Sequence, residues 1–270
     1  MIPSAGPLPA GSDPAHGRLA GTTALVTGGL GGVLATALGD AGADLVLTGR
    51  NRAGLASLRD RLAARGIASS AVPADLTDPD AALRVTRTAT ELFGGIDLLV
   101  NCIGVAGPHG QNPDADWWHT TEVNLHATVR AVVPGMIARG RGRVVNVVSA
   151  AGRHRWPGAS AYSVSKAAVI KLTENLAQEA PGRGVTAFAF HPGLLHIGIT
   201  AAHLARGQVG DPTSDHIWAW LRQERDTGGF TCLDSTVDAF LLLSDGTADP
   251  LSGHYLTTDD IFGLREEPDA

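Results

Sequence analysis

Short apolar runs alternate along this chain with longer stretches whose hydrophobic residues recur every three or four positions. The apolar runs predict buried strands, and the 3–4 spacing predicts helices that pack on them. The predicted strands are 22–27, 44–48, 67–72, 96–101, 143–148, 185–190 and 254–257. The predicted helices are 34–41, 53–65, 78–93, 115–139 and 160–180. Nearly continuous apolar strands alternating with helices predict a single-domain, doubly wound parallel α/β sheet of Rossmann type, with helices on both faces.

Two segments stand outside this alternation. Residues 1–17 are rich in Pro, Gly, Ala and Ser and lack a basic and then apolar leader pattern, so we expect a flexible tail before a domain over 18–265. Segment 194–232 is polar, contains Trp218 and Trp220, and is longer than an ordinary loop. Long insertions in compact domains are often lids, so we expect a substrate lid here. A surface helical hairpin whose tryptophans pack on the core is a compatible alternative.

Composition restricts the partners. The 270 residues carry a net charge of −6, which argues against a general nucleic-acid surface. No run of 18 apolar residues is present, so we expect no membrane partner and a cytoplasmic protein. The two cysteines are far apart, which argues against a disulfide framework, and no His, Cys and Asp cluster has the spacing of a metal site.

Tyr162 and Lys166 carry the most informative chemistry. They lie four residues apart at the start of a predicted helix and therefore share one face, and Ser149 ends an apolar strand upstream. A nearby cation favours the phenolate form of a tyrosine. The pattern predicts that Tyr162 gives or takes a proton at a substrate oxygen to which Ser149 hydrogen-bonds. An ordinary amphipathic helix with a snorkelling lysine is the alternative for the pair alone.

Further motifs occur in a fixed order around this pair. They are Thr27-Gly28 after the first strand, Asp75-Leu76 after the third, Asn101-Cys102-Ile103-Gly104 after the fourth, Asn124 in the long helix, Pro192-Gly193 after the sixth strand, and Gly253-His254-Tyr255-Leu256 at the last. Together with Ser149, Tyr162 and Lys166, this order resembles the short-chain dehydrogenase/reductase family over about residues 19–263.

The resemblance implies hydride transfer between a nicotinamide and a small-molecule carbonyl or alcohol. Tyr162 would be the acid/base, Lys166 would lower its pKa and hold the nicotinamide ribose, Ser149 would polarise the substrate oxygen, and Asn124 would order a proton-relay water. Asp75 and Leu76 would hold the adenine, Pro192 and Gly193 would lie near the nicotinamide, and Asn101 and Gly104 would complete the cofactor site. The resemblance also implies a homodimer or homotetramer formed through the helices over 115–139 and 160–180.

The glycine-rich loop departs from the family pattern Thr-Gly-x-x-x-Gly-x-Gly. This chain has Thr27-Gly28-Gly29-Leu30-Gly31-Gly32-Val33-Leu34. In one alignment Gly32 is the middle glycine, Leu34 replaces the last, and the helix is about three residues short. In the other, Gly29-Leu30-Gly31 is the Gly-x-Gly and three loop residues are missing. We favour the second, because removing three helical residues would rotate the rest by roughly 300°.

This contraction leaves two outcomes open. Gly28, Gly29, Leu30 and Gly31 would form a shorter phosphate cradle, or cofactor binding is weakened or lost. The second outcome favours an alternative function, in which a cyclase, dehydratase or isomerase uses the same tyrosine without net redox chemistry.

The end of the second strand indicates which nicotinamide cofactor is preferred. Arg50 follows it where an acidic residue would hold a ribose hydroxyl, so NADP(H) is favoured over NAD(H). For the substrate, His154 and Trp156 follow Ser149 in a loop that we expect to face it, as does Leu194 at the start of the predicted lid.

Overall fold

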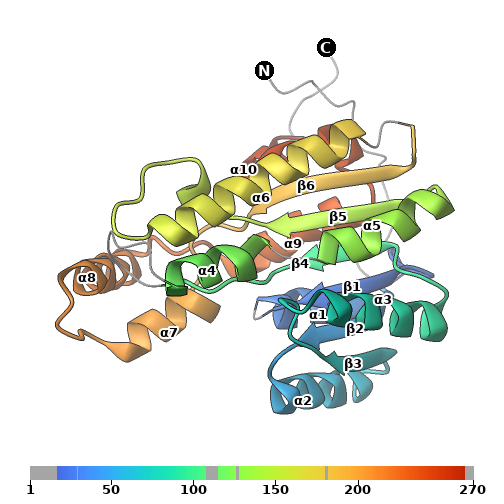
Figure 1. The fold of residues 1–270 in the computed structure, drawn as a ribbon, viewed down its shortest axis with the longest axis horizontal. Helices are drawn as coiled ribbons and strands as arrows, with labels where there is room; N and C mark the ends of the chain where they lie inside the picture. Colours follow the sequence, from blue (N-terminus) through green and yellow to red (C-terminus); the bar gives the residue numbers. More distant parts are fainter. Residues whose placement is uncertain (1–16, 29, 108–114, 126–127, 180–181, 265–270) are drawn as a thin grey trace.

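A seven-stranded parallel sheet forms the centre of the molecule, in a computed structural model that describes residues 17–28, 30–107, 115–125, 128–179 and 182–264 (Figure 1). Its strand order is β3-β2-β1-β4-β5-β6-β7, and every neighbouring pair is parallel. The strands are β1 Thr23–Thr27, β2 Asp44–Gly49, β3 Ser69–Pro73, β4 Leu98–Asn101, β5 Gly142–Val147, β6 Val185–His191 and β7 Tyr255–Thr257. The predicted Rossmann-like fold is confirmed.

Helices cover both faces of this sheet. They are α1 Gly31–Asp40, α2 Arg52–Ala63, α3 Pro79–Phe93, α4 Ala115–Leu125, α5 Thr128–Arg139, α6 Ser160–Glu179, α7 Gly198–Arg206, α8 Pro212–Thr227, α9 Leu233–Ser244 and α10 Thr258–Gly263. Two short 3-10 helices, Ala150–Gly152 and Asp249–Leu251, follow β5 and α9.

The strands are buried on both faces because successive side chains point to opposite sides of the sheet. In β1, Ala24 and Val26 face a core that includes α1, α2, α9 and α10. Leu25, between them, faces a second core that includes α3, α5 and α6. This explains why the strands read as nearly continuous apolar runs.

The boundaries differ from the sequence prediction at a few places. The helix expected over 115–139 is described as α4 and α5, with residues 126–127 between them outside the described residues. Helix α1 begins at Gly31, three residues earlier than predicted. Asp78 caps the N-terminus of α3, since its carboxylate accepts the backbone N–H of Asp80 at 3.0 Å. Residues 1–16 of the expected tail lie outside the described residues.

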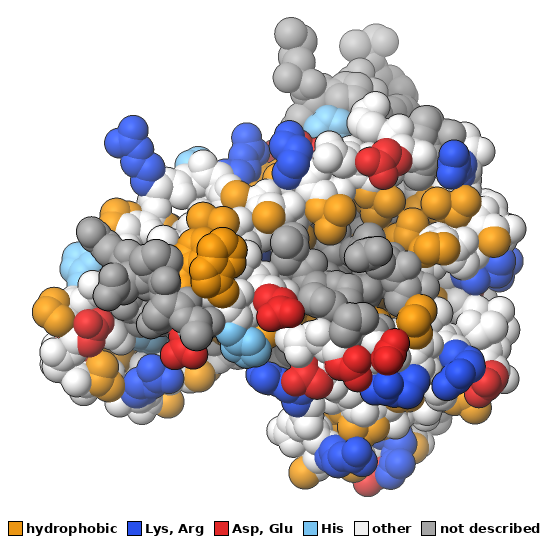
Figure 2. Space-filling model, viewed as in Figure 1, with side chains coloured by type: hydrophobic (Ala, Val, Ile, Leu, Met, Phe, Trp, Pro, Cys, Tyr) orange, Lys and Arg blue, Asp and Glu red, His pale blue; other side chains and the backbone are white. Residues whose placement is uncertain are grey.

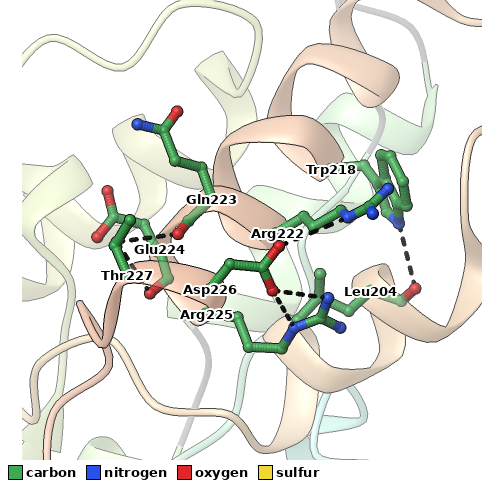
Figure 3. Close-up of polar contacts among 8 residues, drawn as sticks. All are labelled: Leu204, Trp218, Arg222, Gln223, Glu224, Arg225, Asp226 and Thr227. Atoms are coloured by element: carbon green, nitrogen blue, oxygen red, sulfur yellow. Dashed lines mark hydrogen bonds and ion pairs between the residues drawn. The ribbon is translucent and has the colours of Figure 1, made fainter.

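Segment 194–232 folds into the helix pair α7 and α8, which lies beyond the carboxyl ends of β5 and β6 (Figure 1). The Trp218 indole donates a hydrogen bond to the Leu204 carbonyl of α7 at 3.2 Å, and the Arg222 guanidinium lies over the Trp218 ring (Figure 3). Asp226 forms ion pairs with Arg222 and Arg225 along the outer side of α8 (Figure 3). Trp218 therefore holds α8 against α7. The segment is a helical hairpin, as in the alternative given above, and its role as a lid stays a prediction.

Within the described part of the chain, no helix is long and apolar enough to cross a bilayer. The predicted cytoplasmic location stays a prediction.

Candidate active site

The predicted catalytic residues meet at one edge of the sheet. Ser149 follows β5 by two residues, and Tyr162 and Lys166 lie in the first two turns of α6. Because all strands are parallel, their carboxyl ends share this edge, which is where ligands bind in open α/β sheets. The Lys166 Nζ lies 5.8 Å from the centroid of the Tyr162 ring. The Ser149 hydroxyl lies near enough to the Tyr162 phenol to lower its pKa, so the structure brings the three side chains together.

Lys166 is almost completely buried, with 4% of its surface exposed. Its ammonium donates hydrogen bonds to the carbonyl of Val147 at 2.9 Å and to that of Ile103 at 3.4 Å. Burial lowers the pKa of Lys166 to about 8, because removal from water disfavours its charged form. The two carbonyls are the last of β5 and a residue just after β4, so Lys166 ties α6 to both strand ends.

The pKa of Tyr162 differs from the sequence expectation. Burial raises it above the ordinary value, and the hydrogen bond with Ser149 lowers it by a smaller amount. We expected the nearby lysine to lower this pKa. The ammonium instead lies over the ring face, 5.8 Å from the ring centroid, and is hydrogen-bonded to backbone carbonyls, and desolvation is the largest effect on the Tyr162 pKa. In this state the phenol is neutral and available as a proton donor.

Asn124 connects α4 to the start of α6. Its side-chain oxygen accepts the Val105 N–H at 2.8 Å, and its amide donates to the Val105 carbonyl and the Ser165 hydroxyl, both at 3.0 Å. Ser165 in turn donates to the Tyr162 carbonyl at 2.7 Å. Sequence reasoning missed Ser165, although its place between Tyr162 and Lys166 was visible. Asn124 thus fixes the loop after β4 against the catalytic helix, and its part in a water relay stays a prediction.

A chain of buried polar side chains crosses the sheet next to the site. The Asn101 oxygen accepts from the Thr27 hydroxyl at 3.3 Å, and the Asn101 amide donates to the Asn146 oxygen at 3.3 Å. Asn146 donates to the Thr173 hydroxyl of α6 at 2.9 Å. The side chain of Asn101, a predicted cofactor residue, is therefore engaged inside the protein. Its contact with a cofactor stays a prediction.

A cavity of about 560 Å³ opens beside the ends of β1, β2 and β3. Five of the predicted cofactor residues line it: Gly28, Arg50, Asp75, Leu76 and Gly104. Sequence reasoning missed the remaining lining residues, which are Gly32, Thr48, Gly49, Asn51, Gly54, Leu55, Leu58, Arg61, Ala74, Thr77, Ile103, Val105 and Val123. The helical spacing of 54, 58 and 61 was available as a signal, but only tertiary packing shows which way that face points.

The start of α1 fits a phosphate cradle. Gly28 has a φ of +79°, and a Cβ there would overlap the carbonyl oxygen of Cys102. Three residues, 28–30, join β1 to α1, and no side chain of the described residues caps the first N–H groups of the helix. Such N–H groups at a helix N-terminus attract phosphate. Leu30 and Gly31 lie in this turn, outside the cavity lining, and Gly29 lies outside the described residues.

The carboxyl end of β6 closes the other side of the site. Pro192 is buried, and Gly193 has a φ of +81° and lies beside the Thr231 side chain. The Leu194 N–H donates to the Thr231 hydroxyl at 3.1 Å, and the Thr231 N–H donates to the Leu194 carbonyl at 2.8 Å. The side chain of Ile199, in the first turn of α7, lies beside Gly104: a Cβ at Gly104 would be 3.8 Å from the Ile199 Cδ1 and 3.6 Å from the Lys166 Nζ. The cavity accordingly ends near Gly104, and its lining does not include Tyr162, Lys166, Pro192 or Gly193.

The predicted substrate loop contacts the helix pair. Trp156 and Trp220 of α8 lie edge to face with their ring centroids 5.2 Å apart. His154 is exposed and lies near His191, which is stacked on Tyr255. Loop 150–158 and α8 therefore approach each other over the catalytic edge. Among the described residues, no three His, Cys, Asp or Glu side chains form a group that could hold a metal ion.

Comparison with known proteins decides the family. The family model described as short chain dehydrogenase matches residues 22–206. The chain belongs to this family. A short chain dehydrogenase of Pseudocercospora fijiensis is 38% identical over 188 residues, which cover 66% of this chain and 61% of that protein. The chain thus spans less than two thirds of that relative's length.

Other relatives match over a greater length. The gluconate 5-dehydrogenase of Gluconobacter oxydans is 30% identical over 249 residues, covering 89% of this chain and 94% of the relative. A crystal structure from Burkholderia xenovorans, assigned to the short-chain dehydrogenases/reductases, superimposes with a TM-score of 0.80 at 27% identity, covering 94% of this chain and all of that one. The family resemblance inferred from the motifs is confirmed.

The raised pKa of Tyr162 is directly measurable, because the chain contains only two tyrosines, Tyr162 and Tyr255. Burial also raises the pKa of Tyr255. We expect an ultraviolet absorbance titration of the native protein to show phenolate formation only above pH 10. Tyr255→Phe isolates Tyr162, and Ser149→Ala should move its midpoint higher by removing the hydrogen bond that lowers it. A midpoint below 10 for Tyr162 would contradict the burial argument.

Proposed function

We propose that this protein is an NADP(H)-dependent oxidoreductase that transfers a hydride to a carbonyl, or from an alcohol, of a small molecule. The observation that carries this proposal is the half-buried Tyr162, whose pKa is raised, with Ser149 and Lys166 beside it near a glycine-bordered cavity. Membership of the short-chain dehydrogenase family and similarity to a gluconate 5-dehydrogenase support it.

Tyr162 acts as the acid in the reducing direction. Its phenol gives a proton to the carbonyl oxygen as negative charge develops there, while the Ser149 hydroxyl hydrogen-bonds to the same oxygen. The Lys166 ammonium then stabilises the phenolate that remains. In the oxidising direction the phenolate takes the alcohol proton back. A bound nicotinamide would donate or accept the hydride at the substrate carbon.

The residues of the cavity suit a dinucleotide. Gly28 and the N-terminus of α1 would hold the pyrophosphate, and Asp75 and Leu76 would border the adenine. Arg50 would pair with a 2′-phosphate, which favours NADP(H) over NAD(H). Gly104, Lys166, Pro192 and Gly193 would border the nicotinamide ribose and ring.

We propose that segment 194–232 is the substrate lid. Leu194 begins it, and Trp156 contacts its second helix through Trp220. With His154, these residues would shape the substrate site. Because Ile199 lies close to Lys166 and Gly104, the first turn of α7 would have to shift when the nicotinamide ribose enters.

The first prediction separates proton transfer from cofactor binding. Removing the phenol hydroxyl leaves no acid, so Tyr162→Phe should lower turnover of a ketone with NADPH by about 10²–10⁴-fold, the usual share of a general acid. NADPH binding, measured by fluorescence titration, should change little. Tyr255→Phe is the matched control and should retain turnover.

Two results would count against the proposal. Unchanged turnover in Tyr162→Phe would remove this residue from the reaction, and failure of the wild-type protein to bind NADPH at millimolar concentration would remove the hydride donor. The second result would favour the non-redox alternative, a cyclase, dehydratase or isomerase that uses Tyr162. Turnover with NADPH would exclude that alternative.

The pKa of Lys166 predicts a pH limit. With a pKa of about 8, its ammonium is present below pH 8 and is lost as the pH rises through that value. We expect kcat/KM for the ketone to fall above pH 8. In Lys166→Arg the guanidinium stays charged, so this fall should disappear, although the absolute rate is lower. A wild-type profile that stays flat to pH 10 would contradict the assignment.

We also propose a homodimer or homotetramer. Figure 2 shows hydrophobic side chains gathered over α6 and the neighbouring part of α4, and Trp118 and Val164 of these helices are 64% and 47% exposed. Paired copies would cover these side chains. Sedimentation velocity should show more than one chain per particle, and Val164→Glu should shift the population toward monomer. A wild-type monomer at micromolar concentration would rule the assembly out.

A further inference from the structure

One wall of the cavity comes from an unexpected element, helix α2. From the first turn of α1, Gly32 lines the cavity, and a Cβ there would lie 3.8 Å from the Leu58 side chain. Opposite, α2 presents Gly54, Leu55, Leu58 and Arg61 to the cavity. These positions recur at helical spacing and lie along one face. The cavity therefore extends along α2 as well as over the strand ends.

The Arg61 guanidinium is held toward the N-terminal end of α2. Its Nη1 donates a hydrogen bond to the Ser57 hydroxyl, one turn earlier in α2, at 3.0 Å. Helical side chains already lean toward the helix N-terminus, and this bond draws the guanidinium further in that direction. The N-terminal end of α2 adjoins Arg50 and Asn51, which also line the cavity. Arg61 thus extends toward Arg50.

Neither arginine of the cavity is at ion-pair distance from a carboxylate of the described residues. Among the described residues that line the cavity, Asp75 is the only acidic one, and its carboxylate accepts hydrogen bonds from the backbone and hydroxyl of Thr77. These hydrogen bonds from Thr77 are the larger cause of the lowered pKa of Asp75, and Arg50 is near enough to contribute to it. Neither Arg50 nor Arg61 forms a salt bridge with the residues that the structure describes. Two other arginines nearby do form ion pairs, Arg59 with Asp60 and Arg65 with Asp40.

We propose that Arg61, together with Arg50, binds a phosphomonoester: the 2′-phosphate of the cofactor's adenosine ribose. This assignment rests on the proposed function and names the residues of α2 that perform part of the recognition. Arginine suits the task because its planar fork donates two parallel hydrogen bonds to phosphate oxygens. Leu55 and Leu58 line the same cavity and give it an apolar wall beside the two arginines.

The test compares two probes that differ by this phosphate, 2′,5′-ADP and 5′-AMP, by titration calorimetry at fixed ionic strength. Loss of one charged hydrogen-bond partner should weaken 2′,5′-ADP binding by about tenfold in Arg61→Ala, with 5′-AMP unchanged. Arg61→Lys should restore part of the loss. Arg59→Ala is the matched control, because this arginine lies on the same helix, pairs with Asp60 and does not line the cavity. It should bind both probes as the wild-type protein does.

The possible failures are distinguishable. If the wild-type protein binds NADPH but Arg61→Ala binds 2′,5′-ADP normally, or loses both probes equally, the role of Arg61 is wrong and the oxidoreductase proposal stands. If the wild-type protein binds 2′,5′-ADP no better than 5′-AMP, both the role of Arg61 and the preference for NADP(H) are wrong, and only the hydride-transfer part of the oxidoreductase proposal stands. If the wild-type protein binds neither NADPH nor NADH, both proposals are overturned.

Discussion

A buried ammonium holds the active site together. Lys166 bonds to the carbonyl of Val147 at the end of β5 and to that of Ile103 after β4, while the helix that carries it also carries Tyr162. An ammonium without partners in this position would be costly, so these contacts fix the spacing between α6 and the sheet edge. Asn124 adds a second attachment through Val105 and Ser165. The catalytic geometry therefore depends on tying one helix to two strand ends.

Burial also shifts the pKa values of Tyr162 and Lys166 in opposite directions. It raises the pKa of the Tyr162 phenol and lowers that of the Lys166 ammonium, because in each case water no longer stabilises the charged form. The phenol is thus ready to donate a proton before any substrate binds. Ser149 opposes this shift and is placed to share its hydrogen bond with a substrate oxygen.

Helix α2 borders the cavity beside the strand ends. Three residues lie between β1 and α1, and α2 lines the cavity with Gly54, Leu55, Leu58 and Arg61. With Arg50 after β2, the cavity therefore contains two arginines. At the far end of the cavity, the Ile199 side chain of α7 and the Lys166 ammonium both lie beside Gly104.

The sequence alone determined the fold and predicted the residues that the structure brings together at the sheet edge. Buried parallel strands require apolar residues on both faces, and this pattern is visible in the sequence. The spacing of Ser149, Tyr162 and Lys166, and the place of Asn124 before them, can be recognised even if the element boundaries are wrong by a few residues. Only the tertiary structure decided the rest, because it depends on burial and on contacts between distant segments. Burial raises the pKa of Tyr162, the Asn101 side chain hydrogen-bonds to Asn146, and Arg61 lines the cavity. Each of these depends on contacts between segments that are distant in the sequence, so no local pattern predicts it.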